Sequence, residues 1–274
     1  MADNLRPASL DEALTALAHP WTVLAGGTDF YPARVGRAIE DNVLDITGIA
    51  DLRGISAGPA GWRLGATTTW AELIEMPLPA LFDGLKQAAR EIGGRQIQNA
   101  GTLAGNLCNA SPAADGVPPL LALDAEVELA GRAGTRRLPL SAFLAGNRRT
   151  MLAPDELLVA IHVPKPAHDA RSAFLKLGAR RYLVISIAMA AATVEIEHAR
   201  VVDARIAVGA CSAVAQRLPA LEAALAGAPV TMLAERVDTA HLAPLSPIDD
   251  VRGSAAYRRD AVVTLLRRLL RGVA

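Results

Sequence analysis

The spacing of apolar residues predicts helices near both ends of the chain and one in the middle. Residues 81–92 carry apolar side chains three and four positions apart, and Gly93 follows them as a stop signal. The sequence SLDE (9–12) has the form of a capping box before a first helix, and TWAE (69–72) repeats that form before a short one. A last helix is expected from about Ser254. Its arginines are expected to form a solvated face: Arg258, Arg259, Arg267 and Arg268.

Short runs of alternating or β-branched residues predict strands between these helices. The expected strands before residue 165 are TVLAG (22–26), NVLDI (42–46), WRLGATT (62–68), AEVELA (125–130) and ELLVAIHV (156–163). KPAHDA (165–170) has the composition of a linker. The expected strands after it are AFLKL (173–177), TVEIE (193–197) and RIAVGA (205–210). The chain is therefore expected to divide into three segments, at about residues 1–55, 56–165 and 170–274.

Composition narrows the classes of function. The 274 residues are 51% hydrophobic and 20% charged, which is typical of a globular protein with room for two or three subdomains. A formal net charge of +0 gives no basic excess for nucleic acid. No apolar run reaches the roughly 20 residues that span a bilayer, and the N-terminus lacks a secretion signal, so we expect a cytoplasmic protein without membrane insertion.

Metal-binding residues are few. Only two cysteines occur, Cys108 and Cys211, far apart in the sequence, and the five histidines show no ligand spacing. Two thiolates cannot supply the four ligands of an iron–sulfur cluster or a structural zinc. No metal site is expected on this chain.

Small residues cluster at the end of the first predicted strand, in LAGGTDF (24–30). Glycine permits positive φ and close approach of the backbone, and successive amides in such a turn can form a nest for an anion. Thr28 adds a hydroxyl donor. The alternative is an ordinary turn that ends a strand.

A longer stretch of small residues occupies the middle of the chain, NAGTLAGNLCNASPAAD (99–115). We expect a loop here, because these side chains bury little surface. Neither stretch has the Gly-Lys-Ser/Thr of a phosphate loop, and neither matches G-x-G-x-x-G between a strand and a helix. Two loops of amides and hydroxyls could nevertheless clamp the diphosphate of a dinucleotide from both sides.

These two stretches resemble the FAD-binding medium subunit of the molybdenum hydroxylases, the family of xanthine dehydrogenase and aerobic carbon monoxide dehydrogenase. The resemblance rests on LAGGTDFYP and on QIQNAGTLAGNLCNASPAADGVPPLLALDAEVEL. It continues in order through GATTTWAEL, DELLVAIHVP, FLKLGARRY, ARIAVGA and YRR, and so covers nearly the whole chain.

The resemblance implies an α+β fold of the vanillyl-alcohol-oxidase type. Residues 1–55 and 56–165 would be two subdomains that hold FAD between them. Residues 170–274 would be a C-terminal domain with a three-stranded antiparallel sheet and flanking helices.

The resemblance also implies cofactor-binding positions. Ala25 to Asp29 would form a first diphosphate loop, and Thr102 to Asn106 with Asn109 a second. The implied positions are Ala25, Gly26, Gly27, Thr28, Asp29, Ile92, Gly93, Thr102, Gly105, Asn106, Asn109, Ser111, Asp115, Leu157, Leu158 and Lys176.

Several of these positions have ordinary alternatives. Leu157 and Leu158 would be core in any strand, Lys176 could be a surface lysine, and Asp115 could cap a helix. Cys108, which lies between the implied positions, would be a small buried hydrophobe. No histidine or cysteine stands where a flavin is attached covalently in relatives, so FAD is expected to be non-covalent.

The implied function is electron transfer within a hetero-oligomer. FAD would receive electrons from 2Fe–2S clusters on a small subunit, which are reduced by a molybdopterin centre on a large subunit, and pass them to an external acceptor. The alternatives are a stand-alone FAD-dependent oxidoreductase and a non-catalytic assembly subunit. No catalytic residue on this chain can be nominated from the sequence.

Overall fold

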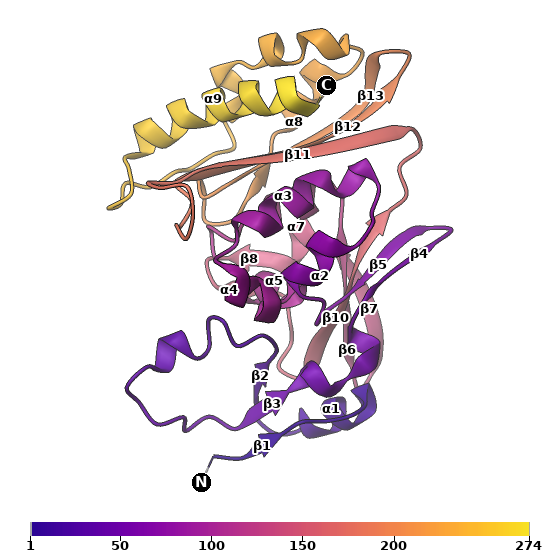
Figure 1. Cartoon of the computed structure of the whole chain (residues 1–274), viewed down its shortest axis with the longest axis vertical. Helices are drawn as coiled ribbons and strands as arrows, with labels where there is room; N and C mark the ends of the chain where they lie inside the picture. The colour runs from indigo at the N-terminus through magenta and orange to yellow at the C-terminus, as the bar shows by residue number, and fades with distance from the viewer. Residues whose placement is uncertain (1, 274) are drawn as a thin grey trace.

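Three β-sheets follow one another along the long axis of the molecule, from the N-terminus at one end to the C-terminal helix at the other (Figure 1). The computed structural model describes residues 2–273. No helix within this range is long and apolar enough to cross a membrane.

The first sheet is small and parallel. Strands β1 (Asn4–Leu5) and β2 (Thr22–Leu24) both pair with β3 (Val43–Asp45). Helix α1 (Leu10–Ala16) begins at Ser9, whose hydroxyl accepts from the backbone N–H of Glu12. The Glu12 carboxylate reaches back to the N–H of Ala8 rather than Ser9, so the predicted capping box forms with its second bond shifted by one residue.

The second sheet is antiparallel and has the strand order β4-β5-β10-β6-β7. These strands are β4 (Ile55–Gly58), β5 (Gly61–Gly65), β6 (Glu126–Gly131), β7 (Gly134–Pro139) and β10 (Glu156–Pro164). The central strand β10 is buried along most of its length because it packs against helices on one side and against the first sheet on the other. Its unbroken apolar run follows from that double burial.

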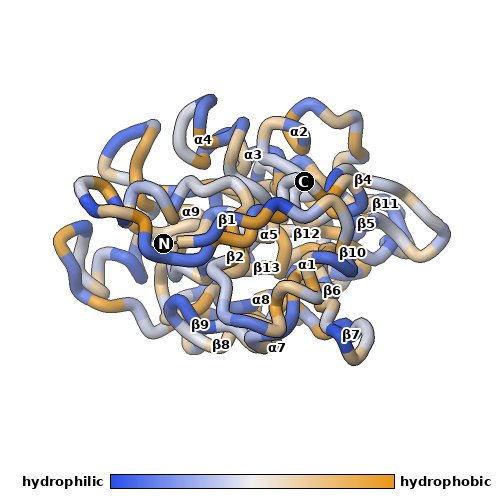
Figure 2. Tube along the Cα trace, turned by 90° about the horizontal axis from the view of Figure 1, so that it is seen from below, coloured by the Kyte–Doolittle hydropathy of each residue, from blue (hydrophilic) through white to orange (hydrophobic). Residues whose placement is uncertain are grey.

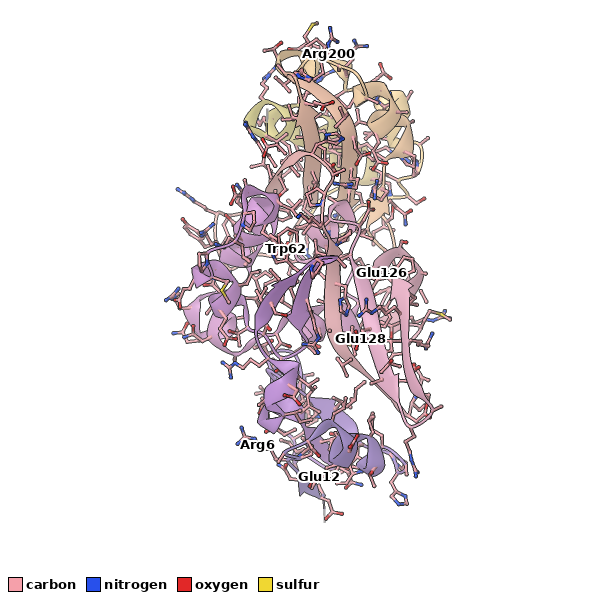
Figure 3. All side chains as sticks on the ribbon, turned by 90° about the vertical axis from the view of Figure 1, so that its right-hand side faces the viewer. Arg6, Glu12, Trp62, Glu126, Glu128 and Arg200 are labelled. Atoms are coloured by element: carbon pink, nitrogen blue, oxygen red, sulfur yellow. The ribbon has the colours of Figure 1, made fainter. Side chains whose placement is uncertain are left out.

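Part of this sheet faces solvent and carries ion pairs. Glu128 on β6 contacts Arg137 on β7 at 3.1 Å and His162 on β10 at 2.6 Å. Figure 3 looks toward this sheet, with Glu126 and Glu128 labelled on β6 and Trp62 on β5. Charged cross-strand neighbours are typical of an antiparallel sheet that has one wet face.

The helices of the middle segment lie between the second and third sheets (Figure 1). They are α2 (Trp70–Glu75), α3 (Asp83–Glu91), α4 (Arg95–Ala100), α5 (Leu103–Asn109), α6 (Val117–Ala122) and the short α7 (Leu140–Phe143). The capping box predicted before α2 is complete, since Thr69 and Glu72 bond to each other's backbone N–H. A two-stranded hairpin follows α7, formed by β8 (Leu144–Gly146) and β9 (Arg149–Thr150). Single 3-10 turns occur at Pro32–Arg34, Ile46–Gly48, Ala50–Leu52, Ala80–Phe82, Val230–Met232, Ala234–Arg236 and Thr239–Leu242.

The third sheet is antiparallel with the order β11-β12-β13-β14. The three long strands that the family resemblance implies are β11 (Asp169–Leu177), β12 (Ala188–Glu197) and β13 (Arg200–Gly209). The structure adds a fourth, β14 (Gln216–Arg217), whose two residues pair with the end of β13. The sheet therefore has four strands rather than the expected three.

Strand β12 begins five residues earlier than the TVEIE pattern predicts, because alternation is lost where both faces of a strand are buried. Ala188, Ala190 and Ala192 face the core shared with helix α9 (Ala255–Val273) and helix α8 (Pro219–Leu225). Met189 and Ala191 face α3 and α6 on the other side. In Figure 2 many apolar segments run through the middle of the molecule, near the labels of β10, β12 and β13, although some also lie in loops at its edge.

Arg258 departs from the solvated face that the sequence predicts for α9. Its side chain is 3% exposed and donates to the carbonyls of Ile187 and Ala210 and, at 2.6 Å, to the carboxylate of Asp250. The loops at the end of the third sheet bring these acceptors together, so no helical periodicity in α9 reveals them. Arg268, by contrast, is exposed as expected.

Arg258→Met should lower the free energy of unfolding by about 3 kcal/mol, because it leaves the buried carbonyls of Ile187 and Ala210 without this donor and removes one of the two arginines that bond to Asp250. Urea unfolding followed by circular dichroism measures this. Arg268→Met on the same helix is the matched control and should change stability by less than about 0.5 kcal/mol. Equal effects of the two substitutions would contradict the structural role of Arg258.

Asp250 should make part of the stability depend on pH. The backbone N–H of Arg252, followed by the guanidinium groups of Arg258 and Arg252, lowers the pKa of Asp250 to about 2 from 3.8. A lowered carboxyl pKa stabilises the fold above the unfolded value, and this contribution disappears as the pH falls from about 4 toward 2. The stability difference between wild type and Asp250→Asn should therefore shrink over that range, whereas exposed Asp260→Asn should track wild type. A constant difference from pH 5 to pH 2 would contradict this.

Candidate functional site

A cavity of about 510 Å³ opens between the segment after β2 and the helices α4 and α5, with β10 behind it. This volume lies within the range of small-molecule and cofactor sites. Most of the lining is apolar or small, and Asp29 and Arg34 are the charged residues among it. Of the positions predicted from the sequence, twelve line the cavity: Ala25, Gly26, Gly27, Thr28, Asp29, Ile92, Thr102, Gly105, Asn106, Asn109, Leu157 and Leu158.

The segment after β2 supplies free backbone donors. Gly27 has φ +67°, which turns the chain away from the strand. The N–H groups of Gly26, Gly27, Thr28 and Asp29 find no acceptor elsewhere in residues 2–273. Unpaired amides that point toward a cavity favour an anionic ligand there.

Gly26 also brings the two predicted loops into contact. A Cβ at this position would overlap the carbonyl oxygen of Ala100 and lie 2.9 Å from the Cα of Gly101. No side chain fits, so backbone lies directly on backbone. Gly101 in turn would place a Cβ 3.3 Å from Trp70 and 3.5 Å from the hydroxyl of Thr28.

The second small-residue stretch differs from the expected loop, because residues 103–109 form helix α5. Thr102 caps it by accepting from the N–H of Gly105, and Leu103 and Leu107 are fully buried one turn apart. The amides of Leu103 and Ala104 donate to the carbonyls of Thr68 and Ala66. The backbone donors expected from this stretch are therefore used within the protein, and its side chains are what face the cavity.

Asn106 lines the cavity and carries a buried acceptor. Its Oδ1 atom is buried and has no hydrogen-bond partner within residues 2–273. A Cβ on Gly116 would lie 2.8 Å from this oxygen, so the oxygen packs close to the backbone of Gly116, a residue outside the cavity lining. A buried acceptor without a donor is unfavourable unless a ligand supplies one.

Apolar side chains form the opposite wall. Ile92, Leu157 and Leu158 are joined there by Trp70 and Ile97, neither of which the sequence singled out. Cys108 is exposed at the cavity rather than buried as expected, whereas Cys211 is buried. Within residues 2–273, no group of three or more potential ligand side chains is arranged to hold a metal ion.

Four predicted positions lie outside the cavity lining: Gly93, Ser111, Asp115 and Lys176. Gly93 has φ +55° and turns the chain between α3 and α4, next to Ile92. The Ser111 hydroxyl accepts from the N–H of Ala113 in the turn after α5.

Asp115 and Lys176 form a buried ion pair. The Lys176 Nζ lies 2.8 Å from Asp115 Oδ2, and the side chains are 5% and 10% exposed. Lys176 also donates to the carbonyls of Glu91 and Val184, and Ser186 donates to Asp115 at 2.6 Å. Burial raises the pKa of the Asp115 carboxyl, against the opposing effect of Lys176 and Ser186. Asp115 caps no helix, and Lys176 is not a surface lysine.

Two arginines beside the cavity are absent from the sequence-based site. Arg34 forms two hydrogen bonds to Asp41, at 2.7 and 2.9 Å, and its guanidinium lies 3.8 Å above the Phe30 ring. Arg148, at the tip of the β8–β9 hairpin, contacts Asp29 and Asn109. The contacts of Arg148 depend on folding that brings distant segments together, whereas those of Arg34 lie within seven residues in an irregular segment that has no periodic pattern.

Comparison with known proteins gives a consistent picture. Residues 1–166 match the family described as the FAD binding domain in molybdopterin dehydrogenase, and residues 173–273 match the CO dehydrogenase flavoprotein C-terminal domain. The chain is 32% identical to a xanthine dehydrogenase FAD-binding subunit from Escherichia coli, over 97% of this chain and 93% of that protein. It is 29% identical to the carbon monoxide dehydrogenase medium chain from Hydrogenophaga pseudoflava, over 96% and 94%.

A solved structure supports the same relationship. A chain of the carbon monoxide dehydrogenase from Hydrogenophaga pseudoflava that lacks the Mo-pyranopterin moiety of its molybdenum cofactor superposes with a TM-score of 0.88. The match has 28% identity and covers 99% of this chain and 96% of that one. The free amides and the cavity agree with these matches. The chain therefore belongs to the family of FAD-binding domains in molybdopterin dehydrogenases.

Proposed function

We propose that this chain is the FAD-binding, electron-transfer subunit of a molybdenum-containing hydroxylase or dehydrogenase. The observation that carries the proposal is the set of unpaired amides from Gly26 to Asp29, whose residues line a cavity in a chain of this family. Bound FAD would supply the redox chemistry, and the protein would supply binding and orientation.

The residues of the cavity fit this cofactor. The free amides and the Thr28 hydroxyl would donate hydrogen bonds to the diphosphate. Such donors can bind an anion without a cluster of lysines, which fits a chain whose net charge is zero. The Asn106 side chain lines the cavity and would contact the cofactor. The apolar wall of Ile92, Leu157 and Leu158 would exclude water from an aromatic ring system. The cofactor would be held non-covalently, as the family resemblance implies.

The positions outside the lining keep a supporting role in the proposal. Asp115 and Lys176 would hold the segment after α5 against strand β11. Lys176 also bonds to the carbonyl of Glu91, the residue before Ile92 in the cavity wall. Gly93 would shape the turn between α3 and α4, and Ser111 the turn after α5. We further propose three structural units, residues 1–55, 56–165 and 170–274, each built around one of the three sheets.

The partners would be a large molybdopterin-binding subunit and a small 2Fe–2S subunit, in a cytoplasmic hetero-oligomer. The relative from Hydrogenophaga pseudoflava bears the name medium chain, and this chain has only two cysteines, too few for iron–sulfur clusters of its own. Electrons would enter FAD from the small subunit and leave to an external acceptor.

The full chain purified after expression should be yellow and should release FAD on denaturation. A visible spectrum before and after heat treatment, with the supernatant identified chromatographically, measures both the amount and the linkage of the flavin. Substrate reduction of this flavin should require the large and small subunits. A chain that takes up no FAD would contradict the proposal, and reduction by a substrate without other chains would favour a stand-alone oxidoreductase.

Asn106→Ala should weaken FAD binding by about tenfold, or about 1.4 kcal/mol, because it removes a polar side chain that lines the cavity. The FAD-free protein should be as stable as wild type, since the replaced oxygen is already unsatisfied and alanine favours the helix. Titration of flavin fluorescence and urea unfolding test the two parts. Asn99→Ala, exposed on α4 outside the cavity lining, is the control. Undiminished FAD affinity in Asn106→Ala would remove Asn106 from the site.

A further inference from the structure

Arg148 joins the two halves of the cavity from a third element. It lies at the tip of the β8–β9 hairpin, 119 residues from Asp29 and 39 from Asn109. Its Nη1 atom donates to Asp29 Oδ2 at 3.1 Å and to Asn109 Oδ1 at 2.5 Å. One guanidinium group thus connects the segment after β2 to the end of helix α5.

The backbone holds Arg148 in this position. Its φ is +52°, a conformation that non-glycine residues seldom adopt, and its N–H donates to the carbonyl of Ala110 at 2.8 Å. Ala110, the residue after α5, is itself left-handed with φ +45°. The hairpin tip and the end of α5 therefore fit each other through main chain and side chain together.

The charges around the cavity explain why an arginine is needed there. Asp29 and Arg34 are the charged residues that line the cavity, and Arg34 is already paired in two hydrogen bonds with Asp41. Without Arg148, the Asp29 carboxylate would stand uncompensated next to the free amides. An uncompensated carboxylate repels an anion, and because the Asp29 and Arg148 side chains are each 58% exposed, solvent and salt screen this repulsion in part.

We propose that Arg148 is a positioning residue for FAD, which neutralises Asp29 and fixes it against Asn109 so that the diphosphate can approach the amides of residues 26–29. The inference rests on the proposed function, because it takes the diphosphate of FAD as the anion. It adds a residue from outside the cavity lining and a reason for its charge.

The experiment compares FAD affinity of the full chain in four forms: wild type, Arg148→Gln, Asp29→Asn and the double variant. Apoprotein is titrated with FAD by fluorescence quenching at about 20 mM and about 500 mM salt, between which screening of exposed charges becomes nearly complete. Arg148→Gln should weaken binding about fivefold at low salt, and by less at high salt. In the Asp29→Asn background, the same substitution should change affinity less than twofold.

Two further variants separate charge from structure. Arg148→Lys keeps the positive charge and should retain most of the affinity. Arg149→Gln removes the neighbouring exposed arginine of the same hairpin, which has no ion-pair partner within residues 2–273, and should bind FAD as wild type does. Urea unfolding of each FAD-free variant gives the loss of fold stability independently of the cofactor.

The outcomes are distinct. Wild-type affinity in Arg148→Gln, or an equal loss in both backgrounds and at both salt concentrations, would overturn the role of Arg148 while leaving the proposed function intact. An equal loss in Arg148→Gln and Arg148→Lys would also overturn it, because the charge would then not matter. A wild-type chain that takes up no FAD would fail the proposed function itself, and the inference with it.

Discussion

The close contact of two backbone segments underlies the cavity and much of what surrounds it. At Gly26 the segment after β2 lies on the peptide group between Ala100 and Gly101, with no space for a side chain. This contact fixes the turn that leaves four amides unpaired, and it holds the first sheet against the end of α4. The contact forms because glycine has no side chain, so any other residue at position 26 would push the two backbone segments apart.

The elements with a regular pattern could be predicted from the sequence, and so could most of the cavity. The helix over residues 81–92, the capping box at Thr69 and the last helix are confirmed, because local spacing and local hydrogen bonds determine them. Burial on both faces hid the start of β12, where alanines replace alternation. The short helix α5 was missed for a related reason, since Leu103 and Leu107 are its few bulky residues among small ones.

Two arginines with structural contacts, Arg148 at the cavity and Arg258 in the third sheet region, could not be predicted, because their contacts join distant segments. Arg258 is buried by loops that precede α9 and follow β13 in the fold, and Arg148 meets Asp29 across 119 residues. Small polar residues, by contrast, indicate a site directly, because residues that are neighbours in the sequence are also neighbours in a turn. A sequence thus indicates where a ligand can approach. It indicates less readily which charged side chains pair with one another around that ligand.

The ion pair of Lys176 and Asp115 has a consequence for the evolution of this fold. Asp115 belongs to the segment matched by one family description, and Lys176 and Ser186 belong to the segment matched by the other. The two modules therefore share a buried charge that neither can neutralise alone. Recombination between related genes at the linker that kept only one partner would leave the other charge buried and unpaired. The two modules are therefore expected to evolve together at this pair, although the linker between them has the composition of an ordinary linker.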